Sequence, residues 1–185
     1  MSVQQRKEKA REERGRLIVS AARELAEAEG WEAVTTRKLA DKVEYSQPVL
    51  YSHFKNMDAI ASAVALQGFD ELTVALTKGV ERAGLRGLAD AYLEFAREHP
   101  ALYQAMFVRQ SELTFAVGEI PASLRAGFAV FLAAVEPHAD GDPETLAELF
   151  WSSLHGLATL QAGSRLRPDL HEHRIDLLVR LITAH

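Results

Sequence analysis

The chain has 185 residues, of which 48% are apolar and 25% charged, and its formal net charge is −5. At this length folding buries roughly 70% of the unfolded surface, so a core forms without disulfides or structural metals. The sequence holds no cysteine and no uninterrupted run of about 18 apolar residues, which argues against disulfide scaffolds, thiolate metal sites, cysteine nucleophiles and a membrane span. Because residues 1–16 are charged rather than apolar, we expect no secretory signal and predict a cytoplasmic location.

Apolar residues recur at helical spacing along most of the chain, beginning with Leu17, Ile18, Ala21 and Ala22. The expected helices cover about residues 17–29, 35–43, 47–55, 57–82, 88–98, 101–108, 121–135, 144–162 and 170–183. Their predicted boundary residues are Gly30, Gly84 and Gly87 as stops, and Thr35 or Thr36, Ser46 and Asn56 as N-caps. The segment 136–143, with two prolines and a glycine, is expected to be a loop.

The predicted fold class is all-α, because strand alternation and hairpin signals are absent from the sequence. We expect a three-helix helix-turn-helix domain over residues 1–60 and a helical ligand-binding and dimerisation domain over residues 61–185. Residues 1–60 hold eleven bases and ten acids, whereas residues 61–185 hold 10 bases and 16 acids. The excess of acidic residues therefore belongs to the second region, and the net charge of the first region is compatible with a DNA-binding surface.

Residues 35–58 carry the most specific pattern. Leu39, Ala40 and Val43 predict the inward face of one short helix, and Leu50 and Phe54 predict that of the next. Two such helices joined by about three residues form a helix-turn-helix, whose second helix enters the major groove of DNA. The spacing alone leaves open the alternative of a plain helical hairpin within a bundle.

This segment resembles the DNA-binding domain of the tetracycline-repressor (TetR) family of transcriptional regulators. The shared pattern is Thr35-Thr36-Arg37-Lys38-Leu39-Ala40 and, after the turn, Leu50-Tyr51-Ser52-His53-Phe54-Lys55-Asn56. Gln47-Pro48 resembles the start of the recognition helix in the repressor that names the family. The resemblance covers about residues 10–60, and later segments, His99-Pro100-Ala101-Leu102-Tyr103 and Trp151 with Leu154-His155-Gly156, resemble the Trp-His-Gly type of C-terminal domain in the family.

The resemblance implies DNA contacts from both short helices. Arg37 is expected to grip guanine O6 and N7, Gln47 to read adenine, and Pro48 and Val49 to pack on a thymine methyl group. Thr36 is expected to bind a phosphate at a helix start, and the alternative for Arg37 is a solvated surface residue. Tyr51 and His53 are expected to hold phosphates, and the alternative for both is structural packing. The complete predicted DNA-binding set is Thr36, Arg37, Ser46, Gln47, Pro48, Val49, Tyr51, His53 and Lys55.

Two positions depart from the family pattern. Glu44 stands where the family has a turn glycine, and a left-handed backbone there costs a residue with a side chain about 1 kcal/mol. Met57 stands where the family usually has a lysine at the start of the next helix, so one phosphate contact is absent unless Lys55 supplies it. The operator sequence of relatives is therefore not expected to transfer.

The second region is predicted to dimerise and to bind an effector. The resemblance implies that two apolar stripes form a four-helix interface between subunits, and the alternative is ordinary core packing. The first stripe is Leu146, Leu149, Phe150, Ser153, Leu157 and Leu160, and the second is Ile175, Leu178, Leu181 and Ile182. An apolar effector pocket is predicted among the aromatic middle helices, and here too the alternative is core packing. Its predicted residues are Tyr92, Phe95, Tyr103, Phe107, Phe128, Trp151 and His155, with Gln104, Gln110, Phe115 and Phe131 as further candidates.

No catalytic or metal-binding pattern accompanies these motifs. The sequence lacks nucleophile-elbow and phosphate-loop patterns, and His171 and His173, two residues apart on a helix, point to different faces. We therefore predict a non-enzymatic homodimer, without cofactor, metal or membrane partner, that binds palindromic operator DNA as a repressor and is released by a small, largely apolar effector. The alternatives are a small-molecule-binding helical module without operator binding and a purely helical interaction protein.

Overall fold

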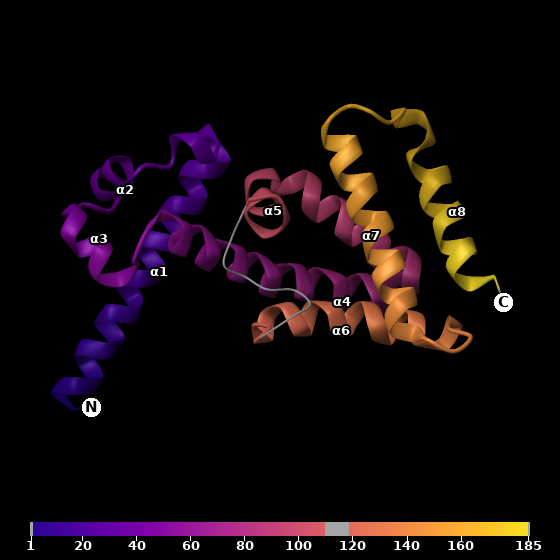
Figure 1. Cartoon of the computed structure of the whole chain (residues 1–185), viewed down its shortest axis with the longest axis horizontal. Coiled ribbons are helices and arrows are strands. Elements are labelled where there is room, and N and C mark those ends of the chain that lie inside the picture. The colour runs from indigo at the N-terminus through magenta and orange to yellow at the C-terminus, as the bar shows by residue number, and fades with distance from the viewer. Residues whose placement is uncertain (1, 110–118, 185) are drawn as a thin grey trace. The chain divides into compact units, whose positions relative to one another are not determined.

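The computed structural model describes residues 2–109 and 119–184, and all regular structure in these ranges is helical (Figure 1). The helices are α1 (Val3–Glu29), α2 (Thr36–Val43), α3 (Gln47–His53), α4 (Met57–Glu98), α5 (Pro100–Phe107), α6 (Ala122–Val135), α7 (Pro143–Ala162) and α8 (His171–Thr183), with single 3-10 turns at Trp31–Ala33, Glu136–His138 and Pro168–Leu170. The all-α prediction is confirmed. Two residues named above as effector-pocket candidates, Gln110 and Phe115, lie outside the described residues.

The chain divides into two compact units by its contacts. The first comprises residues 1–68 and 99–114, and the second comprises residues 69–98 and 115–185. The units are therefore not consecutive in sequence, because the segment that carries α5 packs with the N-terminal helices. The sequence-based boundary between residues 60 and 61 remains a prediction.

Helix α1 begins fourteen residues earlier than the apolar pattern predicts. A capping box fixes its start, since Ser2 Oγ accepts a hydrogen bond from the Gln5 backbone N–H at 3.1 Å and Gln5 Oε1 accepts one from the Ser2 N–H at 2.8 Å. The apolar pattern could not indicate these turns, because they bury no core residue. The helix ends as predicted at Gly30, whose φ of 82° favours glycine.

The first unit has its core between α1, α2 and α3, where Ile18, Leu39 and Leu50 are at most 1% exposed. Helix α5 is anchored to α1 and to the 3-10 turn that follows it by three hydrogen bonds. The Glu27 carboxylate accepts hydrogen bonds from the backbone N–H groups of Ala101 and Leu102 at 3.1 and 3.0 Å, which satisfies donors that every helix start leaves open. The Trp31 indole Nε1 donates to the Ala101 carbonyl at 2.7 Å.

Helix α4 is broken within the second unit. Ala83 and Gly84 have non-helical backbone angles, and Gly84 has a φ of 56°. The prediction of a stop at Gly84 is confirmed, but the prediction for Gly87 is wrong, because the second arm of the helix already includes it. Gly87 instead permits close approach: a Cβ on either Gly79 or Gly87 would collide with the backbone carbonyl of the other.

The apolar character of α4 reflects core packing. It is the one helix in residues 2–109 and 119–184 that is long and apolar enough for a membrane span by length and composition alone, and 44% of its apolar window is buried inside the protein. A buried core helix passes the same test.

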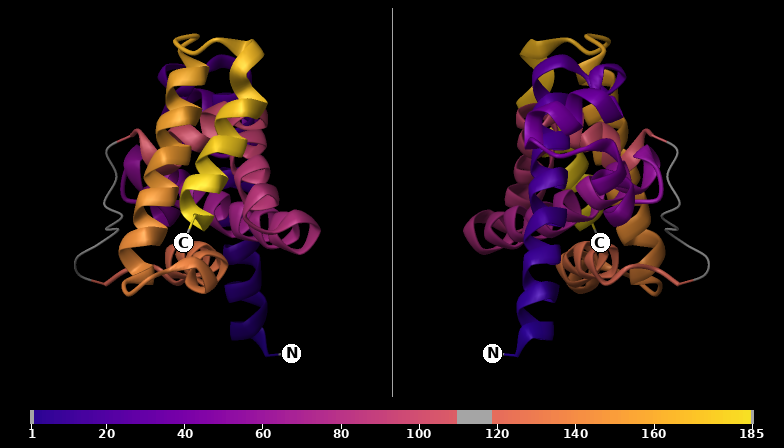
Figure 2. Two further views of the ribbon diagram at one scale, coloured as in Figure 1. Left: turned by 90° about the vertical axis from the view of Figure 1, so that its right-hand side faces the viewer. Right: turned by 90° about the vertical axis from the view of Figure 1, so that its left-hand side faces the viewer.

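The second unit packs α6 and α7 against the second arm of α4. Phe131 and Phe150 meet edge to face at 6.1 Å between ring centroids, and Tyr92 meets Phe131 at 5.9 Å. Helices α7 and α8 lie side by side in both views of Figure 2. Arg86 of α4 ties α8 to this core, because its guanidinium pairs with Asp90 at 2.9 Å and with Glu172 and Asp176 of α8.

Candidate DNA-binding surface and regulatory core

The turn between α2 and α3 has the compact geometry of a helix-turn-helix. Thr35 caps α2 by accepting from the Lys38 N–H at 3.3 Å, and Ser46 occupies the N-cap position of α3 without a side-chain cap bond. Ser46 is therefore confirmed as the N-cap residue, although its hydroxyl does not bond a backbone N–H of the first turn. Pro48 lies in the first turn of α3, where its missing N–H leaves no hydrogen bond unmade.

The predicted DNA-reading residues lie on the exposed side of α2 and α3. Arg37, Gln47 and Pro48 are exposed and Val49 is half-buried, whereas Leu50 points into the core with 1% exposure. Tyr51 is 51% exposed. This division agrees with the inward face predicted at Leu50. Three positions are intermediate: Val49 and His53, which were predicted to face outward, and Phe54, which was predicted to face inward and lies just past the helix end, are all half-buried.

Tyr51 links the two short helices. Its hydroxyl lies 3.1 Å from Thr36 Oγ1 at the start of α2, so the hydrogen bond holds both hydroxyls in one place on the exposed surface. Lys38 and Lys42 fasten α2 to α1 through Glu29 and Glu24, at 2.7 and 3.0 Å. Both lysines thus have carboxylate partners within the protein.

His53 ends α3 against the middle of α1. It is half-buried, and its Nδ1 would lie 3.9 Å from a Cβ placed on Gly15. Burial lowers the pKa of His53, and the positive charges of Arg14 and Arg11 lower it further. The imidazole is therefore neutral near pH 7, and any phosphate contact it makes is a hydrogen bond rather than an ion pair.

Arg11 and Arg14 are the neighbours of α3 that the family pattern did not indicate. Arg11 Nη2 donates to the Ser52 carbonyl at 3.3 Å, and both arginines act electrostatically on His53. The signal that could have found them is their spacing from Ile18, because residues 11, 14 and 18 share one face of a helix. Lys55 lies beyond the end of α3 and is exposed.

The start of α4 keeps its cap despite the departure at Met57. Asn56 Oδ1 accepts from the Ala59 N–H at 2.8 Å, which confirms the predicted N-cap. Met57 is the first helical residue and is half-buried.

Glu44 adopts the left-handed conformation that its position in the family pattern implies, with φ 56° and ψ 35°. We expect Glu44→Gly to raise the free energy of unfolding by about 1 kcal/mol, because glycine removes the steric cost of this backbone. Thermal unfolding measures the change as a rise of about 2–4 °C. Glu44→Ala is the control, since it removes the same charge and keeps the strain; an equal rise in that variant would attribute the gain to charge.

The predicted effector-pocket residues fall into both units. Tyr92, Phe95, Phe128, Trp151 and His155 belong to the second unit, whereas Tyr103 and Phe107 belong to the first and stack at 4.8 Å between centroids. In the second unit, Trp151 Nε1 donates to the Tyr92 hydroxyl at 3.2 Å, and the Trp151 and His155 rings lie 6.3 Å apart. Burial lowers the pKa of His155, so the cluster is neutral and largely aromatic. Tyr92 and Phe95 are buried in the core, at 0% and 6% exposure, whereas Trp151 and His155 are half-buried.

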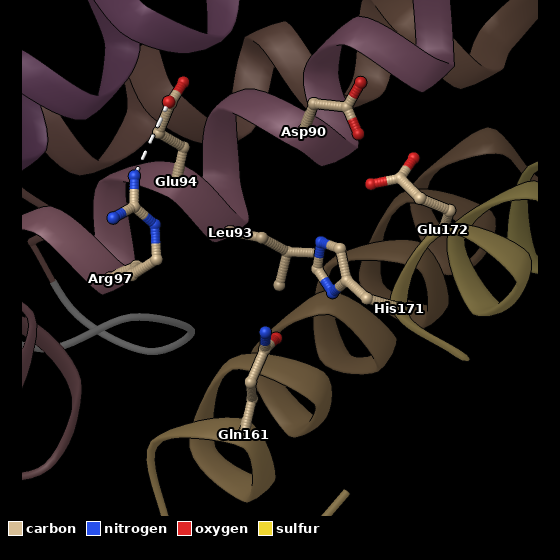
Figure 3. Close-up of a pocket in the computed structure, with 7 residues that line it drawn as sticks. All are labelled: Asp90, Leu93, Glu94, Arg97, Gln161, His171 and Glu172. Atoms are coloured by element: carbon tan, nitrogen blue, oxygen red, sulfur yellow. Dashed lines mark ion pairs between the residues drawn. The ribbon is translucent and has the colours of Figure 1, made fainter. Parts of the chain in front are cut away.

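A separate polar cavity of about 210 Å³ lies where the second arm of α4 meets the end of α7 and the start of α8 (Figure 3). Charged and polar side chains line it: Asp90, Glu94, Arg97, Gln161, His171 and Glu172, with Leu93. Two of its carboxylates, Asp90 and Glu172, already pair with Arg86. The cavity contains none of the predicted effector residues, and its lining differs in character from the aromatic cluster.

The predicted dimer stripes separate into core and surface. Phe150, Ile175 and Ile182 are at most 7% exposed and belong to the core of the unit. Three leucines of the predicted stripes remain on the surface: Leu149 and Leu160 of α7 are 58% and 39% exposed, and Leu181 of α8 is 65% exposed. Leu177, which the predicted stripe did not include, is 45% exposed on α8. These exposed leucines are the residues that a partner subunit could cover.

A helix-turn-helix joined to a larger helical unit defines a DNA-binding transcriptional regulator. The family description "Bacterial regulatory proteins, tetR family" matches residues 18–64, and "Tetracyclin repressor-like, C-terminal domain" matches residues 85–184. The chain belongs to the TetR family of transcriptional regulators. Members of this family are regulators rather than enzymes, and the resemblance inferred from the motif residues is confirmed.

Two relatives agree with this assignment, and a solved structure shares the fold. A Mycobacterium tuberculosis protein named as the HTH-type transcriptional regulator Rv0681 is 31% identical over 150 residues, which are 78% of this chain and 68% of that protein. The Bacillus subtilis regulator YobS is 33% identical over 98 residues, and the match spans about half of either protein, 51% in each case. The crystal structure of a TetR family transcription regulator from Marinobacter aquaeolei VT8 shares the fold, with a TM-score of 0.67, 18% identity and coverage of 98% of this chain and 97% of that one.

Proposed function

We propose that the protein is a homodimeric, effector-responsive repressor that binds a palindromic operator through α2 and α3. The observation that carries the proposal is the arrangement of the recognition helix: Leu50 fixes it to the core while Gln47, Pro48 and Tyr51 face solvent. A single helix of this kind reads only a few base pairs. Two copies held about 34–36 Å apart would read two half-sites, which is why dimerisation belongs to the same proposal.

The base-reading roles follow from the exposed positions. Arg37, in the first turn of α2, would donate two hydrogen bonds to guanine, and Gln47 would pair with adenine. The linked hydroxyls of Thr36 and Tyr51 would meet phosphate oxygens, with Ser46, His53 and Lys55 as further backbone contacts. These contacts position the helix, whereas the base contacts of Arg37, Gln47, Pro48 and Val49 set the sequence preference.

The effector would bind to the aromatic cluster of the second unit, around Tyr92, Phe95, Phe128, Trp151 and His155. The composition of this cluster suits a small, largely apolar molecule with one or two hydrogen-bonding groups. Release from the operator requires that the effector bind the released state more tightly than the operator-bound state. We place this function in the cytoplasm, where a bacterial regulator meets chromosomal DNA.

Substitution of Arg37 tests the DNA-reading role. We expect Arg37→Ala to weaken operator binding by about 1–3 kcal/mol and to relax the preference at one position of each half-site. The operator is first obtained by selecting duplexes from a random library with the wild-type protein, and affinity is then measured by fluorescence anisotropy.

Arg16→Ala serves as the matched control, because it removes the same charge from an exposed position of α1. Unchanged affinity and selectivity in Arg37→Ala would refute the base-reading role. Failure of the wild-type chain to select any sequence would instead favour a small-molecule-binding module without operator binding.

A further inference from the structure

Helix α1 carries a basic face over residues 7–14, and Arg11 on this face contacts the end of α3. Lys7, Arg11 and Arg14 follow the spacing i, i+4 and i+7, and Ile18 continues the same face four residues later. Ile18 is fully buried in the helix-turn-helix core. The face of α1 that packs on α2 and α3 at its apolar end therefore becomes basic at its N-terminal end. We call Lys7, Arg11 and Arg14 the basic stripe.

Contacts on this face fix its orientation. Arg11 donates to the Ser52 carbonyl at the end of α3 at 3.3 Å, and Arg14 and Arg11 both act on the His53 imidazole. The N-terminal turns of α1 project past α2 and α3, as Figure 1 shows. The capping box at Ser2 keeps these turns helical, so the stripe is held in place by a continuous helix.

Charge supports a role for this stripe with a polyanion. Two of the four basic residues between positions 35 and 55, Lys38 and Lys42, already pair with carboxylates of α1. Their pairing reduces the positive potential that the helix-turn-helix itself offers to phosphates. The stripe supplies positive charge next to the end of α3, where Arg11 contacts Ser52.

We propose that Lys7, Arg11 and Arg14 bind the phosphate backbone of DNA beside the segment read by α3. From residue 7 to residue 14 the helix rises about 10 Å, which is comparable to three phosphate steps of about 3.4 Å each along one strand. Phosphate contacts of this kind carry no base preference and add affinity through counterion release. The proposal rests on the proposed DNA-binding function and extends it to a surface outside the helix-turn-helix.

The opposite face of α1 provides a matched control. Lys9 and Arg16 have the same i, i+7 spacing as Lys7 and Arg14, and Lys9 lies 3.9 Å from Glu13 on that face. The test pair is Lys7→Gln with Arg14→Gln, and the control pair is Lys9→Gln with Arg16→Gln. Both double variants lose two positive charges from one helix, so net charge is identical and only the face differs. Circular dichroism verifies that both fold.

The measurement is the dissociation constant for DNA as a function of salt, on a selected operator and on a random duplex. In the test pair we expect the slope of log affinity against log salt to fall in magnitude by about 0.9 for each phosphate that the protein no longer neutralises. The decrease in affinity should be similar on both duplexes, and the sequence preference should persist. The control pair should retain the wild-type slope.

Each outcome separates this inference from the proposed function. Equal slopes in the test and control pairs, with selective binding intact, would overturn the basic stripe and leave the proposed function standing. Loss of sequence preference in the test pair, at an unchanged slope, would also overturn the proposed phosphate contacts, because Lys7 and Arg14 would then act by positioning α3. If the wild-type protein selects no operator but the test pair has a reduced slope on random DNA, the result would support phosphate binding by the basic stripe and refute the proposed operator recognition.

Discussion

Leu181→Glu is expected to convert the protein from a dimer to a monomer and to lower operator affinity about 100-fold or more. Leu181 is the most exposed leucine of α8, at 65%, and Leu177 lies one turn before it. In a two-fold symmetric interface each substitution occurs twice, and burying an unpaired carboxylate among leucines is unfavourable. A monomer also forgoes the gain in affinity that comes from linking two half-site contacts.

Sedimentation velocity at micromolar concentration measures the change in mass, and anisotropy measures operator binding. Val74→Glu is the control, because Val74 is 54% exposed on α4 and undergoes the same chemical change outside the α7 and α8 leucines. It should remain dimeric. A Leu181→Glu protein that stays dimeric would show that the subunit interface lies elsewhere.

Gly87→Ala is expected to destabilise the second unit by about 2–3 kcal/mol. Its Cβ would collide with the Gly79 carbonyl, which belongs to the backbone of the facing arm and cannot rotate away. Gly79→Ala should have a similar effect, because its Cβ would collide with the Gly87 carbonyl and lie 2.9 Å from the Ala91 Cβ. The steric cost outweighs the gain of about 1 kcal/mol that alanine brings inside a helix.

Chemical denaturation followed by circular dichroism measures both variants. Gly15→Ala is the comparison, since its nearest neighbour, His53 Nδ1, would lie 3.9 Å from the new Cβ, an ordinary contact distance. We expect that variant to be slightly more stable than wild type. Wild-type stability in Gly87→Ala would contradict the close crossing of the two arms.

The sequence predicted most helices because each buries a periodic apolar face or carries a recognisable cap. The helix predicted over residues 35–43 is observed at Thr36–Val43, with both an apolar face and the Thr35 cap. The helix predicted over residues 47–55 is observed at Gln47–His53 and ends two residues earlier. Asn56 caps α4 as expected. Prediction failed where a helix depends on other interactions. The first turns of α1 rest on a capping box and charged side chains, and a periodicity search does not detect them.

Gly87 illustrates a second limit. A glycine near a predicted helix end reads as a stop, but here the stop is Gly84 alone, and Gly87 serves a contact with Gly79 eight residues away. The anchoring of α5 by Glu27 and Trp31 is of the same kind, since its partners lie at least seventy residues apart in sequence. Local patterns carry no information on such pairings.

The anchoring of α5 has a consequence for hybrid regulators built by exchanging DNA-binding segments. A junction near residue 60 would transplant Glu27 and Trp31 without the backbone groups of Ala101 and Leu102 that they bind, and would leave a carboxylate and an indole N–H without their native partners. An exchangeable module for this protein therefore comprises two stretches of sequence, residues 1–68 and 99–109. Specificity can be grafted intact only when both stretches move together.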